Sequence, residues 1–373
     1  MSRVIIHRRF RVICNILLLF VFIQFISCNP IKKFNEKKDA VKQRIDELKD
    51  EIDQSFQEIE DKLTEVSEMV PVVPPPATTT EESQAKIEEK LSEEPCLGNV
   101  FTANDVDFPI GAYGGNSAEI PDHTMPAFDS AYEIGADFIS IDLNYSSDHK
   151  LISYATELLE TKTSCMGMAN SYPYSAIAEC NVNSKNEKYL NEKIPLLEDV
   201  LLQYIRKDIG IMLVLKHSGL ASYLNSVLES INTCPSTIYI QFQSVDVIKK
   251  FKSAIPENNP YKLTIDLFTI NQGYDLTKEE DYVKILDTVK NDYQLDGVGL
   301  PYDQITQGFI DYAHGLGLTV GAQDSIATVS SDGVKKLIGF GVDYFLTTTP
   351  QVSIDARDAY LQSQSTLENQ SSP

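Results

Sequence analysis

Between Phe108 and Pro350 the apolar residues follow two alternating patterns. Short runs that are apolar throughout, or at every second residue, predict buried β-strands. The longer stretches between them repeat an apolar residue every three or four positions, which is typical of a helix with one buried face. In the first of these stretches Gly135 follows the last periodic residue and is placed to end the helix.

The first strand, helix and strand show how the pattern works. Phe108–Tyr113 is a short apolar run closed by two glycines, which predicts a strand and a tight turn. Phe138–Tyr145 alternates, so Ser140, Asp142 and Asn144 are expected to share one face of a strand. A unit of this length predicts a parallel pair of strands with a right-handed crossover.

The same unit recurs to the end of this region and gives eight strand predictions. Regular alternation of strands and helices is typical of an α/β protein, and eight repeats predict a closed (β/α)8 barrel, the TIM barrel. We expect this domain to occupy residues 96–360. The predicted strands are 108–113, 138–145, 210–216, 237–242, 262–268, 296–302, 318–324 and 343–350.

Residues 31–70 carry a narrower apolar pattern flanked by charge. The apolar positions are spaced by three and four residues, with one extra step of four, which predicts a coiled coil with a stutter. The alternative is a single amphipathic helix that lies on the barrel. A coiled-coil stalk before the barrel would make the chain a homo-oligomer. The positions are Val41, Ile45, Leu48, Ile52, Phe56, Ile59, Leu63, Val66 and Val70.

Two polar segments complete the domain plan. Residues 71–95 are rich in proline, threonine and glutamate, and the prolines favour an extended, semi-rigid linker. Residues 361–373 are polar, and we expect a disordered tail.

The N-terminus has the composition of an export signal. Four arginines at positions 3, 8, 9 and 11 precede the apolar run Ile13–Cys28. This pattern predicts that residues 1–28 form a signal peptide or a signal anchor that stays in the chain. The protein is then either secreted or held as a type II membrane protein with the barrel outside.

The chain of 373 residues has a formal net charge of −22. This excess of acid argues against nucleic acid as a partner and against docking on anionic lipid through a basic patch. We interpret the acidity as solubility of a secreted protein, for which a membrane is a partner only if the signal anchor is retained. The sequons at Asn144 and Asn369 predict N-glycosylation, with an unmodified surface asparagine as the alternative at each.

Four of the six cysteines lie outside the targeting segment. Cys165 and Cys180 bracket one loop and are expected to form a disulfide, which leaves Cys96 and Cys234 as a second pair. Four cysteines allow three pairings, so the connectivity is open at this point.

Four motifs make the chain resemble the glycerophosphodiester phosphodiesterases. They are Ala112–Gly115 where the family has His-Arg-Gly-Gly, Pro121–Thr124 for Pro-Glu-(Asn/His)-Thr, Gly135–Asp142 for Gly-Ala-Asp-x-(Ile/Val)-Glu-x-Asp, and Tyr154–Thr156 for Phe-His-Asp. The resemblance covers nearly all of residues 108–350. It implies a TIM barrel, an insertion over its mouth at residues 163–195, and phosphodiester hydrolysis by two histidines around a divalent cation.

At several functional positions of that family this chain has other residue types. The resemblance places Ala112 and Ala155 at the two histidine positions and Tyr113 at the arginine position. Ser140 and Val214 stand at two positions that supply metal-binding acids in the family. The resemblance therefore assigns no catalytic residue and no complete set of metal ligands.

Two functional positions retain their residue type. Asp142 matches a metal-binding acid and Lys216 matches the lysine that contacts phosphate in the family. A single aspartate beside a lysine is more simply an ion pair than a metal site, so we expect no cofactor, and Ca²⁺ or Mg²⁺ only if the protein is active. Further candidates to line the pocket are Tyr113, Asp122, His123, Ser140, Gln323 and Asp324.

Two functional hypotheses follow. The first is a secreted or surface-anchored pseudoenzyme whose barrel is a binding or structural module, with a phosphate-bearing or polar small molecule as ligand. The second is an active phosphoric diester hydrolase, acting on glycerophosphodiesters or phospholipids through a rebuilt site that uses Asp142, Lys216, His123 or Asp122. Loss of both acid–base groups costs orders of magnitude in rate, which favours the first hypothesis.

Overall fold

The computed structural model describes residues 107–231, 237–255, 259–270, 273–324 and 329–371. The predicted targeting segment, coiled coil and linker lie outside these ranges, and so do Cys96 and Cys234. The expectations for those residues stay predictions.

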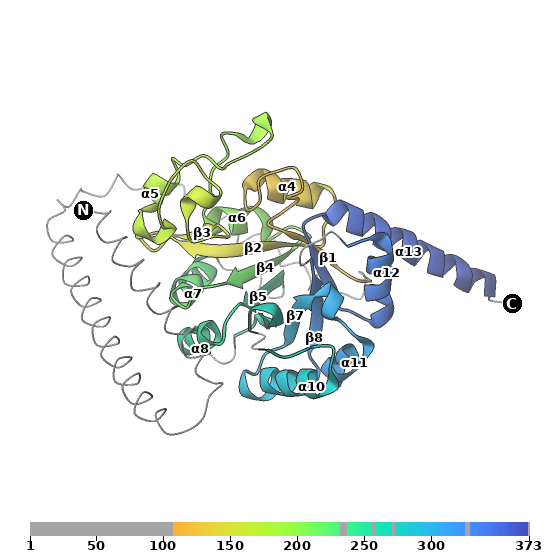
Figure 1. Cartoon of the computed structure of the whole chain (residues 1–373). Helices are drawn as coiled ribbons and strands as arrows, with labels where there is room; N and C mark the ends of the chain where they lie inside the picture. The colour runs from red at the N-terminus through yellow and green to blue at the C-terminus, as the bar shows by residue number, and fades with distance from the viewer. Residues whose placement is uncertain (1–106, 232–236, 256–258, 271–272, 325–328, 372–373) are drawn as a thin grey trace, which may run out of the picture. The chain divides into compact units, whose positions relative to one another are not determined.

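The described part of the chain folds as a closed barrel of parallel strands, which confirms the predicted (β/α)8 architecture (Figure 1). The strands follow the order β1-β9-β8-β7-β6-β5-β4-β2, and the pairing of β1 with β2 closes the barrel. Every predicted strand segment contains one of these strands. Their bounds are β1 Ile110–Tyr113, β2 Phe138–Tyr145, β4 Gly210–Leu215, β5 Ile238–Phe242, β6 Lys262–Asp266, β7 Gly297–Pro301, β8 Thr319–Gln323 and β9 Tyr344–Thr347.

Helices surround the barrel and bury the outward-facing side chains of the strands (Figure 1). Ser244, Thr306 and Ser330 each begin a helix, because their hydroxyls accept a hydrogen bond from a backbone N–H in the first turn. The longer helices are α4 Met125–Glu133, α6 Leu197–Tyr204, α7 Leu220–Ser230, α8 Val245–Ala254, α10 Glu279–Asp287, α11 Gln307–Gly315 and α12 Ser331–Phe340. Short helical turns follow β6, α10 and β7, at α9 Leu267–Ile270, η5 Thr288–Asp292 and η6 Tyr302–Gln304.

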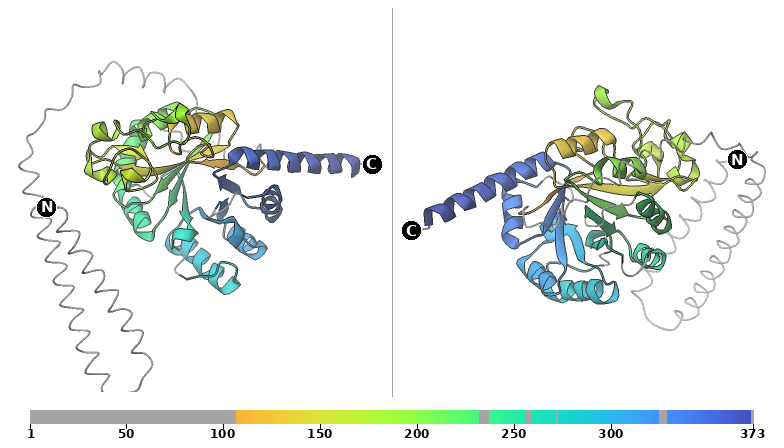
Figure 2. Two further views of the ribbon diagram at one scale, coloured as in Figure 1. Left: turned by 45° about the horizontal axis from the view of Figure 1, so that its top comes forward. Right: turned by 180° about the vertical axis from the view of Figure 1, so that it is seen from behind.

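The predicted disordered tail at 361–373 is wrong for residues 361–371, which continue helix α13 (Pro350–Ser371). No glycine or proline interrupts the segment between Pro350 and Pro373, so nothing in the sequence ends the helix earlier. Figure 2 shows its C-terminal half extending beyond the barrel. Among the helices in the described ranges, none is long and apolar enough to cross a bilayer.

The insertion begins with a strand that the sequence pattern did not predict, so it starts at Leu151 and not at residue 163. Strand β3 (Leu151–Ser153) pairs antiparallel with the C-terminal half of β2. The segment that follows contains the short helices η1 Leu159–Thr161, η2 Ala169–Ser171, α5 Tyr174–Ile177 and η3 Glu187–Tyr189. It is ordered because it has a core of its own, made by Ile152, Tyr154, Leu159, Ala169, Ile177, Val182 and Ile194.

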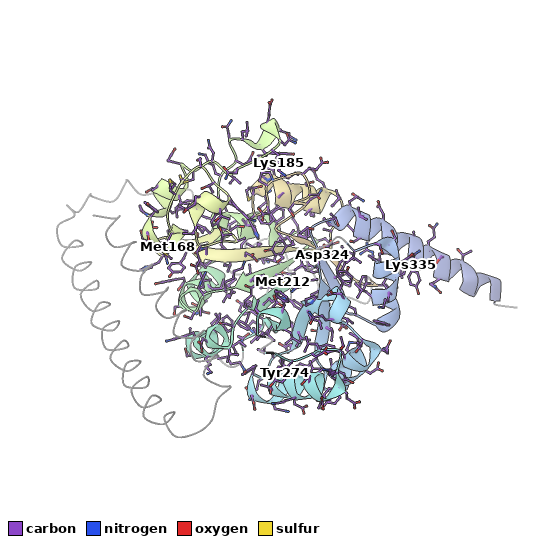
Figure 3. All side chains as sticks on the ribbon, viewed as in Figure 1. Met168, Lys185, Met212, Tyr274, Asp324 and Lys335 are labelled. Carbon is purple, nitrogen blue, oxygen red and sulfur yellow. A yellow bond between two sulfur atoms is a disulfide. The ribbon has the colours of Figure 1, made fainter. Side chains whose placement is uncertain are left out.

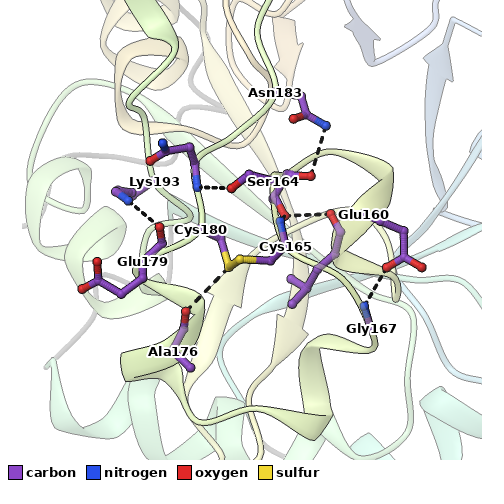
Figure 4. The surroundings of a disulfide bond; sticks show 12 residues. Glu160, Ser164, Cys165, Gly167, Ala176, Glu179, Cys180, Asn183 and Lys193 are labelled. Carbon is purple, nitrogen blue, oxygen red and sulfur yellow. Dashed lines mark hydrogen bonds between the residues drawn. A yellow bond between two sulfur atoms is a disulfide. The ribbon is translucent and has the colours of Figure 1, made fainter.

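The predicted disulfide between Cys165 and Cys180 is confirmed (Figure 4). Backbone pairing beside it holds the same two chain segments together, since Ser164 N–H donates to Asn181 O at 2.8 Å and Asn181 N–H donates to the Ser164 hydroxyl at 3.0 Å. Closing this loop covalently favours the ordered insertion by restricting the unfolded chain.

Gly115, in the turn after β1, is a position where any side chain is expected to destabilise the barrel. Its φ is +87°, and an added Cβ would lie 2.4 Å from the backbone carbon of Ala127. We expect Gly115→Ala to lower the free energy of unfolding by more than about 2 kcal/mol, measured by urea unfolding. Gly135→Ala is the control, because Gly135 also has positive φ (+76°) but no atom within 4 Å. Equal losses in the two variants would contradict the close approach at Gly115.

Candidate functional site

The buried carboxylate of Asp142 lies at the mouth of the barrel and accepts two hydrogen bonds. Its Oδ2 accepts from the hydroxyl of Tyr113 and from the ammonium of Lys216, each at 2.6 Å. Lys216 also donates to the backbone oxygen of Ala155 at 2.9 Å. The side chain of Asp142 is 0% exposed and that of Lys216 is 23% exposed. The expected ion pair is confirmed, and Lys216 is the member of it that solvent and a ligand can reach.

Burial and charge decide the protonation states of this group. Burial acts to raise the pKa of Asp142, but electrostatic interactions with His123 and Lys216 and the hydrogen bonds from Lys216 and Tyr113 hold that pKa below its ordinary value. Burial raises the pKa of Tyr113 above its ordinary value, and the charge of Asp142 adds to the shift. The carboxylate is therefore ionised near neutral pH, and the tyrosine keeps the proton that it donates.

His123 lies against Asp142 from the turn before α4. Its Nε2 is 3.8 Å from Oδ2 of Asp142, and its ring packs edge-on against Tyr113 with 5.6 Å between ring centroids. The side chain is 2% exposed, and neither ring nitrogen has a hydrogen-bond partner. Burial lowers the pKa of His123, so the imidazole is neutral near neutral pH. The sequence offered His123 as a candidate to line the pocket, and the fold brings it beside the retained carboxylate.

Asp122 connects the mouth to the insertion. Its carboxylate forms an ion pair with Lys162. The backbone N–H of Tyr154 also donates to the backbone oxygen of Asp142 at 2.9 Å. These contacts fix the insertion against the turn that carries His123 and against β2.

Asp266, at the C-terminal end of β6, is a polar residue of the mouth that sequence reasoning missed. One of its oxygens accepts from Gln323 Nε2 at 3.1 Å and from the backbone N–H of Phe268 at 3.0 Å. Burial raises the pKa of Asp266 to about 6, although these hydrogen bonds oppose the shift and the charge of Asp142 adds to it. An acidic residue within a predicted buried strand was the signal available, and Asp142 carries the same signal.

The raised pKa of Asp266 predicts a pH dependence of stability. Because the folded-state value, about 6, exceeds an unfolded value of about 3.9, the folded state binds more protons between these two pH values. The free energy of unfolding is expected to fall by on the order of 2–3 kcal/mol as pH rises from about 4 to about 6, and to lose nothing further from this group above that. Asp266→Asn keeps a hydrogen-bond acceptor and should remove this fall in urea unfolding. The exposed Asp303→Asn is the control, and an unchanged pH profile in Asp266→Asn would contradict the assignment.

The two candidate pocket residues at the end of β8, Gln323 and Asp324, have different surroundings in the structure. Gln323 points to Asp266, as described above, and so lines the mouth. Asp324 binds β9 instead, since its Oδ2 accepts from the Thr347 hydroxyl at 2.5 Å and from the backbone N–H of Thr348 at 3.0 Å. Figure 3 shows Asp324 near the centre of the molecule.

The remaining histidines in the described ranges lie away from Asp142. His217 is 3.7 Å from Glu157, His149 stacks on Tyr223, and His314 is 2.9 Å from Asp343. These contacts give each of the three histidines a structural role.

The glycosylation predicted at Asn144 is corrected by the fold. The side chain is 4% exposed, and its Nδ2, the atom that would carry the glycan, donates to the backbone oxygen of Thr156 at 2.7 Å. The folded barrel leaves no room for a glycan there. The sequon at Asn369 stays a prediction.

Comparison with known proteins identifies the family. The family model described as "Glycerophosphoryl diester phosphodiesterase family" matches residues 115–320. This chain belongs to the glycerophosphoryl diester phosphodiesterase family. It is 34% identical to the uncharacterized protein YqiK of Bacillus subtilis over 110 residues, which is 29% of this chain and 45% of that protein. It is 23% identical to a glycerophosphodiester phosphodiesterase of Bacillus altitudinis over 256 residues, 67% of this chain and 98% of that protein.

A solved phosphodiesterase structure shares the fold. The protein from Oleispira antarctica, solved in complex with the product sn-glycerol-3-phosphate, superposes with a TM-score of 0.55 and 19% identity. The superposition covers 67% of this chain and 96% of that chain. The barrel described above is therefore the family's barrel.

The position matched to the first family histidine does not face the mouth. Ala112 is paired in register with Ile139, an outward-facing residue of β2, and is buried in the layer between strands and helices. Its neighbour Tyr113 is paired with Ser140 and faces inward. The expectation that Ala112 lines the mouth is therefore wrong, because alternate residues of a strand face opposite sides of the sheet.

The residues around Asp142 do not fit the family's divalent cation. Such a cation takes about six or more oxygen ligands. Oδ2 of Asp142 already accepts from Lys216, whose positive charge would repel a cation, and the adjacent inward residue on β4, Val214, has no side-chain oxygen. The Ser140 hydroxyl and Oδ1 of Asp142 are without partners but are only two atoms. In the part of the chain that the structure describes, no cluster of three or more His, Cys, Asp or Glu side chains could hold a metal.

Proposed function

We propose that this barrel is a non-hydrolysing member of its family and serves as a binding module for a small polar or phosphate-bearing ligand. The observation that carries the proposal is the state of Asp142, which is wholly buried and saturated at Oδ2 by Tyr113 and Lys216. Such a carboxylate is a poor base because its pKa is lowered. It is also a poor ligand for a metal ion, because two strong hydrogen bonds already stabilise its negative charge.

Lys216 is the group that supports a phosphate-bearing ligand. Its ammonium donates to Asp142 and Ala155, which leaves one of its three hydrogens to bind a third acceptor. The related Oleispira antarctica phosphodiesterase was solved with sn-glycerol-3-phosphate, so a glycerophosphate is the first ligand to test here. The charge of Lys216 is balanced by Asp142, and we therefore expect modest affinity.

A hydrolase with a rebuilt site is the second candidate, and Asp266 with His123 is the observation that favours it. Burial raises the pKa of Asp266 to about 6 and keeps His123 neutral, so the mouth holds one group that can donate a proton and one that can accept it. The pKa of Asp266 is displaced towards neutral pH, as general acid catalysis requires, whereas the pKa of His123 is displaced away from it, which makes His123 a weaker base.

The setting that we propose for the barrel follows from the N-terminal sequence. The basic and apolar residues 1–28 support secretion or anchoring at the cell surface, and the apolar positions in residues 31–70 support a homo-oligomer formed by a coiled coil. Several barrels on one stalk would raise the avidity of weak pockets without any new contact.

The test is turnover of glycerophosphodiesters by the purified chain, with Ca²⁺ or Mg²⁺ and with a chelator. We expect no hydrolysis in any of these conditions. Metal-dependent hydrolysis that Asp142→Asn abolishes would overturn the proposal and would mean that a cation displaces Lys216. Hydrolysis in chelator that is lost in Asp266→Asn would establish the rebuilt site instead.

A further inference from the structure

The large apolar side chains that the described part of the chain exposes lie mainly on segments that follow the C-terminal ends of barrel strands or belong to the insertion. Met166 is 74% exposed and Phe268 is 62% exposed, on segments that leave the C-terminal ends of β3 and β6. Isolated exposed apolar residues are ordinary, but a group of them around the mouth of a barrel marks an interaction site. Tyr132 on α4 and Val352 on α13 are the two elsewhere. The members on the mouth side are Leu158, Met166, Met168, Tyr172, Leu190 and Phe268.

Four of these residues belong to one loop, residues 158–172, which we call the Met166 loop. Leu158 and Met168 face each other across an isolated β-bridge, and the ring of Tyr172 lies against Gly167. Met168 lies at the outer edge of the insertion (Figure 3). Leu158 and Met168 thus lie side by side on the loop, and Met166 precedes Met168 by two residues.

The backbone of the Met166 loop is held in place. Leu159 N–H donates to Gly167 O at 2.8 Å, and Gly167 N–H donates to a carboxylate oxygen of Glu160 at 2.8 Å (Figure 4). The disulfide at Cys165 lies next to Met166. The insertion has its own buried core beneath the loop, and Met166 and Met168 are not part of it. Met166 and Met168 are therefore exposed on a loop that is already ordered. Little conformational entropy of the loop is lost when it docks on a partner.

We propose that the mouth side of the barrel docks on a zwitterionic phospholipid surface, with Met166, Met168 and Phe268 entering the headgroup region. The transfer of methionine, leucine and phenylalanine side chains from water into lipid lowers the free energy. Tyrosine is suited to the boundary between water and lipid. The proposal is independent of whether the mouth binds or hydrolyses a ligand.

Charge and chain organisation favour lipid as the occupant of this face. Residues 147–195 contain five lysines and six acidic residues, so this segment is nearly neutral in a chain of net charge −22. A zwitterionic surface does not repel such a face, whereas an anionic one repels the chain as a whole. The 106 residues before the described part include the apolar run Ile13–Cys28, which is predicted to direct the chain to a membrane.

The chain contains no tryptophan, so a single introduced tryptophan reports on its own position. Full-length Met166→Trp and Phe268→Trp variants are mixed with phosphatidylcholine vesicles, and the emission of each is recorded. We expect a blue shift and protection from an aqueous quencher in both variants. Val352→Trp, on α13, is the matched control and is expected to show neither, although it carries the same N-terminal segment.

Further variants measure the contribution of the Met166 loop. In the Phe268→Trp background, Met166→Ser with Met168→Ser is expected to lower the vesicle partition coefficient at least about tenfold, whereas Tyr132→Ser leaves it unchanged. Adding phosphatidylserine to the vesicles is expected to weaken binding at low salt.

Three results would overturn the proposal. They are unchanged emission of Met166→Trp with vesicles, an equal shift in Val352→Trp, and a blue shift that rises with protein concentration in the absence of lipid. The last would show that a second copy of the chain covers this face.

Discussion

Lys216→Met is expected to lower the free energy of unfolding by about 3–5 kcal/mol, because it leaves the carboxylate of Asp142 buried without its counter-charge. Asp142 is 0% exposed, and the only strong donor that then remains to its Oδ2 is the hydroxyl of Tyr113. Urea unfolding followed by circular dichroism measures the loss. Lowering the pH should reduce it, since protonation of Asp142 removes the unpaired charge.

Two controls separate charge burial from lost packing. Asp142→Asn combined with Lys216→Met removes both charges and is expected to recover most of the stability lost in the single variant. Lys278→Met breaks an exposed pair with Asp275 and is expected to leave the free energy of unfolding nearly unchanged. If the double variant is as unstable as Lys216→Met, the loss comes from packing, and the importance of the ion pair is refuted.

The second large effect is expected when acidic residues are placed at the two positions that lack them. Ser140 and Val214 face the barrel interior, and Val214 is the register neighbour of Asp142 on β4. Ser140→Glu with Val214→Glu places three carboxylates together in a buried site. In chelator we expect this variant to lose more than about 3 kcal/mol of stability, because the added charges are buried unpaired.

Calcium is expected to reverse that loss. A cation at one hundred times its dissociation constant adds about 2.7 kcal/mol to stability. Thermal unfolding with Ca²⁺ and with chelator measures the difference, and the unmodified chain is the control that should show none. A variant that Ca²⁺ does not stabilise would mean that Lys216 or Tyr113 blocks the cation even when the acids are present.

The sequence determined the barrel because its evidence is periodic. Strands that are buried on both faces read as short apolar runs, and helices with one buried face repeat every three or four residues, so each of the eight strands was placed from its own residues. Strand β3 and the C-terminal extension of α13 were not predicted from this periodicity. Three residues are too few to show a period, and a polar segment without a stop signal reads as a tail although it continues a helix.

The sequence also determined part of the site. Asp142 on β2 and Lys216, which follows the last residue of β4, lie on the same face of neighbouring strands, so their pairing could be predicted. Cys165 and Cys180 close a loop short enough to suggest a disulfide. The disulfide prediction needed only local spacing, whereas Asp142 and Lys216 were singled out by their resemblance to family positions.

Tertiary structure alone decided the rest of the mouth. Tyr113 on β1 donates a hydrogen bond to Asp142 on the neighbouring strand β2, and His123 lies beside Asp142 from a turn. Gln323 donates to Asp266 over a sequence separation of 57 residues. The pKa values of these groups depend on burial, which no single segment specifies. Ala112 and Asn144 were misplaced for the same reason, because which side a residue faces and what covers it are settled only when strands, helices and insertion pack together.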